Sequence, residues 1–270
     1  MAKYRPFRMV LNAGTTYYTP KDVIIKVEKI ATNSTTDAYL WIKTARIGPL
    51  ISEIAPMTIS SSNFLGPLSL RDRYLVIPRE SDFKFEGASG SQMLLEGQWI
   101  LLDKPDEVPK ELAERGLTQF KDYYMYIRQT TSLAVDQKLP ANGEVEILSL
   151  TPKAIEKFIL NNYLGVKVTN YTPSYGELAL RFFYDNGYLE TLTDLPGSLR
   201  IGGIDVKKAP HPPALTADAE YFTLENNPVT VEGNHTLKIY VRNIKGSDIA
   251  PSTGTALTFD IYLIVNYVSQ

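Results

Sequence analysis

The segment ALTFDIYLIVNYV, residues 256–268, is the most regular stretch of the chain, and the fold can be inferred outward from it. Apolar side chains fall on every second position, which is the period of a β-strand with one face against a core. These side chains are Leu257, Phe259, Ile261, Leu263, Val265 and Tyr267. The positions between them are mixed, with Asp260 and Asn266 beside Tyr262 and Ile264. Such a strand is typical of the centre of a sheet, or of a sheet face that a neighbouring subunit covers.

A second strand of the same kind closes the first part of the chain, in SQMLLEGQWILLD, residues 91–103. Its alternating face carries Met93, Leu95, Trp99 and Leu101, with Gly97 on the same side. We therefore predict an all-β protein of two β-sandwich, jelly-roll-like units, each ending on its dominant strand. A shared apolar-x-apolar-Glu-Gly pattern in residues 83–87 and 229–233 suggests a duplication, although so short a pattern also recurs by chance in β-proteins.

Turn residues and charge divide the chain into segments. Residues 37–44, DAYLWIKT, form one of several short predicted strands, with Tyr39 and Trp41 on one face. The predicted segments are an N-terminal arm (1–21), a first β-sandwich (22–128) with a charged insert (104–122), a linker (129–143) and a second β-sandwich (144–270). Within the insert we predict a short exposed helix from Pro109 to Arg115.

One helix is predicted in the second unit, over residues 151–164. Thr151 is a suitable N-cap, Pro152 suits the first helical position, and Gly165 suits the end. The helical face consists of Ile155, Phe158, Ile159 and Tyr163. Beyond it, the dipeptide Asn186-Gly187 predicts a hairpin. Further strands are predicted over 187–192, 198–206 and 220–226.

Composition excludes several classes of function. The formal net charge is −2 and the pI is about 5.8, so there is no electrostatic case for binding nucleic acid or an anionic membrane. The chain contains no cysteine, which excludes disulfides, thiol catalysis and cysteine-ligated metals. The apolar run near the N-terminus is too short for a signal peptide, and no stretch reaches membrane-spanning length. We expect a protein that is made soluble in a host cytoplasm.

No residue pattern identifies a reaction, a cofactor or a metal. His211 and His235, the chain's two histidines, both lie in turn-forming sequence, and we interpret them as exposed turn residues without a chemical role. A Ser-His-Asp triad would need one of them. Paired carboxylates on a β-sandwich could hydrolyse glycosides, but no signature selects a pair. We therefore expect a protein that is not an enzyme, with a glycosidase-like enzyme as the third-ranked alternative.

Clustered aromatic residues are the remaining candidates for a functional site. They are Tyr4, Phe7, Tyr17, Tyr18, Tyr123, Tyr124 and Tyr126. Tyrosine serves packing and protein interfaces more often than sugar stacking, so a carbohydrate or cell-surface ligand is the second-ranked alternative. The apolar residues of the arm predict assembly through it, by strand addition to another subunit. The other interpretation is that the arm completes the first sheet of its own subunit.

The first half also carries a family resemblance. The run DVIIKVEKIA, NSTTD, AYLWIKT and FLGPLSLRDRYLVIPRESDFKFEGASGSQMLLEGQWILL resembles the β-sandwich virion proteins of tailed phages and other dsDNA viruses. The resemblance covers residues 22–103 well and 166–268 loosely. It is one of pattern, so no functional residue is carried over, and the segments 104–122 and 151–164 depart from it. It implies a non-enzymatic capsid, decoration, collar or tail component that binds copies of itself and other virion proteins and resides in the virion.

Overall fold

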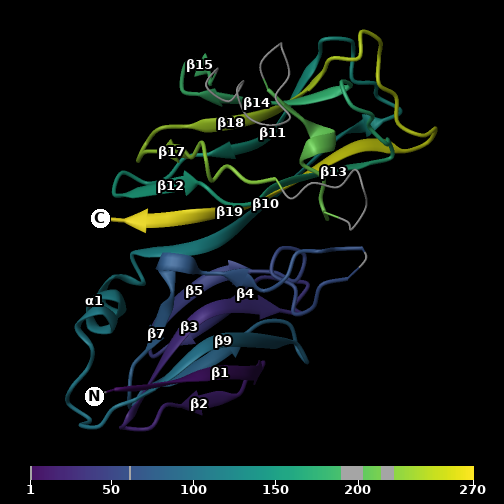
Figure 1. Ribbon diagram of the computed structural model, residues 1–270. Coiled ribbons are helices and arrows are strands. Elements are labelled where there is room, and N and C mark those ends of the chain that lie inside the picture. The colour runs from purple at the N-terminus through teal and green to yellow at the C-terminus, as the bar shows by residue number, and fades with distance from the viewer. Residues whose placement is uncertain (1, 61, 190–202, 214–221) are drawn as a thin grey trace. The chain divides into compact units, whose positions relative to one another are not determined.

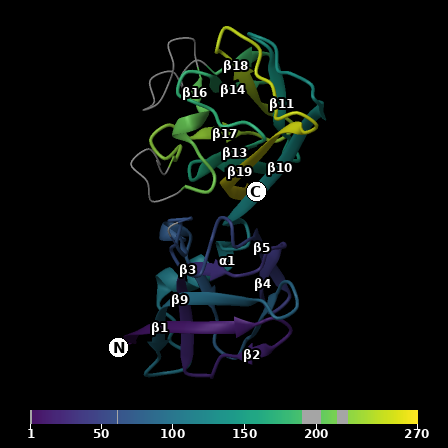
Figure 2. The same ribbon diagram turned by 90° about the vertical axis from the view of Figure 1, so that its right-hand side faces the viewer.

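The computed structural model describes residues 2–60, 62–189, 203–213 and 222–270, and these form two compact units. The first unit comprises Met1–Ser60 and Leu65–Tyr126, and the second comprises Ser61–Phe64 and Ile127–Gln270. In the described residues, each unit is a β-sandwich of two antiparallel sheets (Figures 1 and 2). The all-β fold predicted from the alternating segments is therefore confirmed.

In the first unit, one sheet has the order β1-β9-β3-β6, with β7 also pairing with β3, and the other has the order β2-β8-β4-β5. Its strands are β1 (Lys3–Asn12), β2 (Thr16–Tyr18), β3 (Val23–Thr32), β4 (Ala38–Ile42), β5 (Ala45–Leu50), β6 (Leu68–Ser69), β7 (Leu75–Ile77), β8 (Asp82–Glu86) and β9 (Gln92–Leu101). With β6 and β7 counted as one position, this is the strand order of a jelly roll.

The second unit repeats this order. Its sheets are β10-β19-β12-β17, with β13 also on β19, and β11-β18-β14-β15, with β16 also on β14. The strands are β10 (Asp122–Val135), β11 (Glu144–Leu150), β12 (Glu156–Leu160), β13 (Leu164–Thr169), β14 (Leu178–Tyr184), β15 (Gly187–Tyr188), β16 (Ile204–Asp205), β17 (Val229–Val231), β18 (Leu237–Asn243) and β19 (Ala256–Ser269). Thus β9 and β19 occupy equivalent positions, each beside the first strand of its unit. The patterns at 83–87 and 229–233 fall on the non-equivalent strands β8 and β17, so they do not mark corresponding positions.

Strand β19 is central, as its two apolar faces predicted. It pairs with β10 on one side and with β12 and β13 on the other. Leu257, Phe259 and Ile261 on its inner face have no exposed surface, and Tyr262 on its outer face is 1% exposed. Neighbouring strands of the same chain therefore satisfy both edges of β19.

The segment predicted as an N-terminal arm is part of the first sandwich. Strand β1 pairs with β9 along its whole length, from Lys3 opposite Leu101 to Asn12 opposite Gln92, and β2 pairs with β8. Phe7 and Leu11 are buried in the core. The structure corrects the expectation of a free arm and agrees with the other interpretation, in which the arm completes the sheets of its own subunit. Tyr4, Val10 and Tyr18 nevertheless remain exposed.

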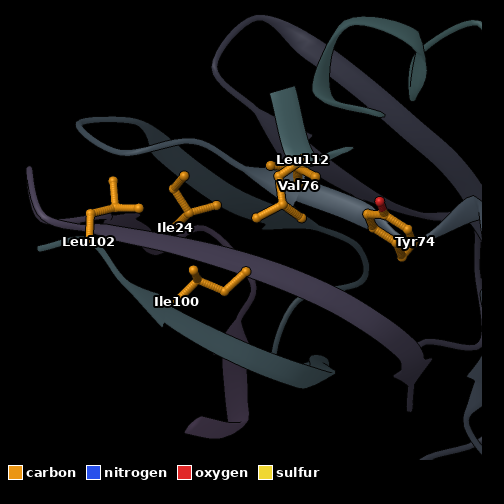
Figure 3. Packing of buried hydrophobic residues seen from close by; sticks show 6 residues of the cluster. All are labelled: Ile24, Tyr74, Val76, Ile100, Leu102 and Leu112. Atoms are coloured by element: carbon orange, nitrogen blue, oxygen red, sulfur yellow. The ribbon is translucent and has the colours of Figure 1, made fainter. Parts of the chain in front are cut away.

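The charged insert contains helix α1 (Lys110–Thr118), which confirms the short helix predicted there. Leu112 packs over Ile24, Val76 and Ile100 on the outer face of the first sheet, as Figure 3 shows. Just beyond the helix, the buried Gln119 side chain accepts a hydrogen bond from Val76 N and donates one to Val76 O. The amide of Gln119 thereby occupies the edge of β7 as a further strand would.

Replacing Gln119 with Ala is expected to destabilise the first unit by about 2–4 kcal/mol. The change leaves the buried N–H and C=O groups of Val76 without these partners, and each unmade bond costs about 1–3 kcal/mol. Urea unfolding followed by tryptophan fluorescence measures the loss. The matched control is the neighbouring exposed Lys121→Ala, which should shift stability by less than about 0.5 kcal/mol. An equal effect of the two changes would contradict the edge-closing role.

The helix predicted over 151–164 is wrong, because residues 156–160 form strand β12. Phe158 lies opposite Tyr267 of β19 and also opposite Val231 of β17. Ile155, placed on the apolar face of the predicted helix, is 61% exposed. A helix could not pair with the end of β19, so sheet pairing outweighs the local helical pattern.

The segment between the two sandwiches is more ordered than a linker. Residues 129–135, placed in a linker from sequence, belong to β10, and the division between the units falls within this strand, after Tyr126. The hairpin predicted at Asn186-Gly187 is confirmed, with Tyr184 opposite Gly187. The strands predicted over 187–192, 198–206 and 220–226 lie partly outside the described residues.

Candidate functional site

The outer face of the β2-β8-β4-β5 sheet carries aromatic rings among paired charges. We call it the first aromatic face; it consists of Tyr39, Trp41, Arg46, Lys84 and Glu86. Alternation along β4 turns Leu40 and Ile42 inward and leaves the rings outward. Cross-strand register then places Trp41 between Arg46 of β5 and Lys84 of β8.

Contacts within the first aromatic face hold its rings in place. Trp41 Nε1 donates to Glu86 Oε2 at 2.5 Å, and Arg46 Nη2 donates to Glu86 Oε1 at 2.8 Å. The Arg46 guanidinium lies 3.4 Å from the centroid of the Tyr39 ring, and Lys84 Nζ lies 5.4 Å from that of Trp41. Burial, and then the carboxylate of Asp37, raises the pKa of Tyr39, so its hydroxyl stays protonated. The face therefore presents two aromatic rings and one arginine, with one more positive than negative side chain.

The equivalent sheet of the second unit, β11-β18-β14-β15, has an outer face of the same character. We call it the second aromatic face; it consists of Glu144, Glu146, Arg181, Phe183, Tyr188, Lys238, Tyr240 and Arg242. Along β18 the inner side chains are buried, and Lys238, Tyr240 and Arg242 alternate with them on the outside.

Glu144 is the centre of the second aromatic face. It accepts hydrogen bonds from Arg181 Nη1 at 2.8 Å, from the Tyr188 hydroxyl at 2.7 Å and from Arg242 Nη1 at 3.5 Å. The Arg181 guanidinium also lies 3.6 Å from the centroid of the Tyr188 ring. Burial, and then the bond to Glu144, raises the pKa of Tyr188. Donors from three residues thus converge on the Glu144 side chain, which fixes its place at the centre of the face.

Both faces have the composition of protein interfaces. Tyrosine, tryptophan and arginine are the residues that most often dominate binding energy, because they bring large area with few rotatable bonds and several hydrogen-bond donors. Ion pairs within each face compensate most of its charged groups and leave an excess of one positive charge, so a partner would bury little uncompensated charge. The topologically equivalent sheet carries such a face in each unit, which makes the faces a repeated feature of the chain.

The two histidines lie in very different surroundings. His235 is an exposed turn residue, as the turn sequence predicted. Its Nδ1 lies 2.5 Å from Asp185 Oδ2. His211 is 6% exposed, so its interpretation as an exposed residue is wrong. Its ring stacks on Tyr262 with 3.5 Å between centroids, and its Nδ1 lies 2.8 Å from the Tyr163 hydroxyl. Proline-rich sequence favours a turn here but does not reveal that the turn packs on β19.

The aromatic residues singled out from sequence are distributed over several surroundings. Tyr4 and Tyr18 are exposed, Tyr17 stacks on Phe83, and Tyr123 is half-buried. Phe7, Tyr124 and Tyr126 are buried, where Phe7 meets the Trp99 ring edge-on and the Tyr126 hydroxyl donates to Asp37. The structure therefore does not gather them into one site. Sequence alternation placed Tyr39 and Trp41 on one face, but no local signal paired them with Arg46 and Glu86.

Acidic groups provide no cation centre in the residues that the structure describes. No group of three or more histidine or carboxylate side chains is placed there to hold a metal ion. Glu177 is held as a carboxylate, because bonds from Lys245, the Ser174 amide and the Tyr171 hydroxyl lower its pKa to about 2. Over the described ranges, no helix has the length and apolar character needed to cross a membrane.

Comparisons with known proteins identify no family. No protein-family model matches the sequence, and no curated protein is significantly similar to it. Among solved structures, the PBCV-1 virus capsid is similar with 10% identity over 99% of this chain and 94% of that chain, at a TM-score of 0.35. The major capsid protein P2 from bacteriophage PM2 is similar with 11% identity over 97% of each chain, at a TM-score of 0.32. An IolB-like protein from Salmonella typhimurium is similar with 9% identity over 100% of this chain and 87% of that chain, at a TM-score of 0.21. TM-scores of this size do not establish a shared fold or function.

Proposed function

We propose that this chain is a non-enzymatic structural component of a virus particle, which self-associates and binds other virion proteins. The observation that carries the proposal is the tandem arrangement of two jelly rolls, with the equivalent sheet of each presenting an aromatic face. Jelly rolls occur both in viral shells and in lectin domains, so the fold alone supports a virion role only by analogy. The chemistry of the two aromatic faces has to distinguish the two functions. The resemblance of residues 22–103 to virion proteins points the same way.

Self-association through the aromatic faces follows from their chemistry. Symmetric assemblies reuse the same contact surface many times, and the equivalent sheet of each unit provides one such surface. On the first aromatic face, the side chains of Arg46 and Glu86 are 44% and 46% exposed, so a partner can still reach them. The outer edge of β1, which pairs with no strand of the described residues, is less suited to the task. Pro6 cannot donate a backbone hydrogen bond, and Arg5 and Arg8 are exposed beside it, as is common on protected edges.

Charge reversal tests the proposal. Sedimentation velocity over a wide concentration range should show wild-type oligomers, and Arg46→Glu and Arg181→Glu should each weaken them. Loss of one central arginine contact costs about 2 kcal/mol or more, which is about thirtyfold in dissociation constant. The control is Lys121→Glu, which makes the same change of charge at an exposed position on neither face.

Two results would contradict the proposal. One is a monomer at every concentration, and the other is an oligomer that neither Arg46→Glu nor Arg181→Glu weakens more than Lys121→Glu does. Carbohydrate binding is the alternative function, because Trp41 lies on an outward sheet face. Glycan binding by a monomer that is lost in Trp41→Ala would favour that alternative.

A further inference from the structure

The segment Gly203–Pro213 packs on the outer face of the β19 sheet through the buried His211, whose ring stacks on Tyr262. Backbone bonds attach it to β13: Val166 N donates to Ala209 O at 2.8 Å, and His211 N donates to Val166 O at 3.1 Å. Farther back, Asp205 of β16 pairs with Ala179 of β14. The histidine is thus part of the contact that attaches this segment to the sandwich.

The imidazole of His211 lies in an enclosed aromatic environment. Its ring is nearly parallel to that of Tyr262, with 18° between the planes. Gly165 of β13 makes room for it, since a Cβ at that position would lie 3.0 Å from His211 Cβ and 2.1 Å from the Tyr163 hydroxyl. Tyr163 can donate to Pro210 O, at 3.2 Å, and still accept from a protonated Nδ1. Hydrogen bonding therefore fits either charge state of the imidazole, and burial and nearby charges decide between them.

The charged groups around His211 disfavour a proton on it. Lys167 of β13 and Arg128 of β10 both repel an imidazolium ion, whereas the Asp260 carboxylate of β19 is already bound by Arg128 and Thr130. The Arg128 guanidinium lies 5.2 Å from the centroid of the Tyr262 ring. A protonated His211 would therefore be a second cation against the same aromatic ring. On the segment itself, Asp205 accepts the backbone N–H of Lys207, whose side chain and that of Lys208 add positive charge.

We propose that His211 is an acid-sensitive latch, whose protonation releases the segment Gly203–Pro213 from β13 and β19. While the ring is neutral it stacks in its enclosed position and holds the segment closed. A proton placed there would be a buried charge that the positive charges of Lys167 and Arg128 repel. Opening the segment transfers the imidazolium to water, which removes that cost.

The direction of the pH dependence follows from proton linkage. Burial, and then the charges of Lys167 and Arg128, lowers the pKa of His211 from 6.5 to about 3 in the closed form. Between these values the open form binds one proton more than the closed form. The population of the open form therefore rises about tenfold for each unit of pH decrease. The rise ends near the pKa of His211 in the closed form. At a pH above the ordinary pKa of histidine, the His211 ring is neutral in both forms, and the closed form is at its most stable.

Hydrogen exchange in the full-length protein tests the latch. The amides of Val166 and His211 report opening once intrinsic exchange rates are corrected for pH. Below the ordinary pKa of histidine, wild type and His235→Gln should both show about a tenfold rise in the population of the open form for each unit of pH decrease. His211→Phe keeps a flat ring of similar size that cannot be protonated, so its opening should not depend on pH over this range. An equal pH slope in His211→Phe, or a flat response in wild type, would overturn the proposal.

Ring-nitrogen NMR of wild type gives a second test that needs no folded variant at position 211. The chain has two histidines, so His235→Gln assigns both sets of signals. Protonation of His211 should coincide with loss of amide protection at Val166. Protonation of the His211 ring near its ordinary pKa while both amides stay protected would show that the closed segment tolerates the charge, and the latch would be refuted.

Discussion

Deleting residues 1–21 is expected to unfold the first sandwich while the second stays folded. The deletion removes the whole of β1 and β2, and with them one edge strand from each sheet of the first unit. Loss of the buried Phe7 and Leu11 side chains alone costs about 5–10 kcal/mol. This is comparable with the entire stability of a typical domain, about 5–15 kcal/mol. An arm that served assembly alone would predict the opposite, with both sandwiches folded and assembly weakened.

The positions of the tryptophans make this experiment selective. Both tryptophans of the chain, Trp41 and Trp99, lie in the first unit, so their fluorescence reports that unit alone. Hydrogen exchange of β18 reports the second unit. Phe7→Ala should lower stability by about 3–5 kcal/mol without removing a strand, whereas the exposed Tyr4→Ala should have little effect. A truncated chain with native fluorescence and impaired oligomerisation would restore the assembly role of the arm.

Gly97→Ala should be among the most destabilising single substitutions in the first unit, at about 3 kcal/mol or more. Gly97 lies at the centre of β9, opposite the irregular register of β3 between Val27 and Lys29. A Cβ there would be 2.0 Å from the backbone oxygen of Lys26, which belongs to the paired strand and cannot rotate away. The strand pairing itself would have to separate to accommodate one methyl group.

A second glycine provides the matched control. At Gly116 in helix α1, a Cβ would meet Val76 at 3.9 Å, which is ordinary contact. Gly116→Ala should therefore raise stability by about 0.5–1 kcal/mol through helix propensity. Urea unfolding followed by tryptophan fluorescence compares the two variants in the same unit. A loss below about 1 kcal/mol for Gly97→Ala would mean that the bulge in β3 shifts readily.

The sequence determined those features that depend on residue type and local period. Strict alternation in 91–103 and 256–268 identified the two dominant strands and, through them, two β-sandwich units. Charge density identified the short helix of the insert, in which Leu112 is the buried residue and the rest depends largely on local sequence. Alternation in 37–44 likewise placed Tyr39 and Trp41 on a common face.

Tertiary structure decided every feature that depends on partners distant in the chain. Residues 156–160 carry a helical pattern but form a strand, because β17 and β19 offer backbone partners on both sides. Residues 1–21 resemble a free arm in composition, yet β9 and β8 bind them. His211 lies in a turn-like sequence but is buried against Tyr262. Trp41 can donate its hydrogen bond to Glu86 only because β4 pairs with β8. Local propensities are worth less than about 1 kcal/mol per residue, and burial of one large side chain or satisfaction of a strand edge outweighs them.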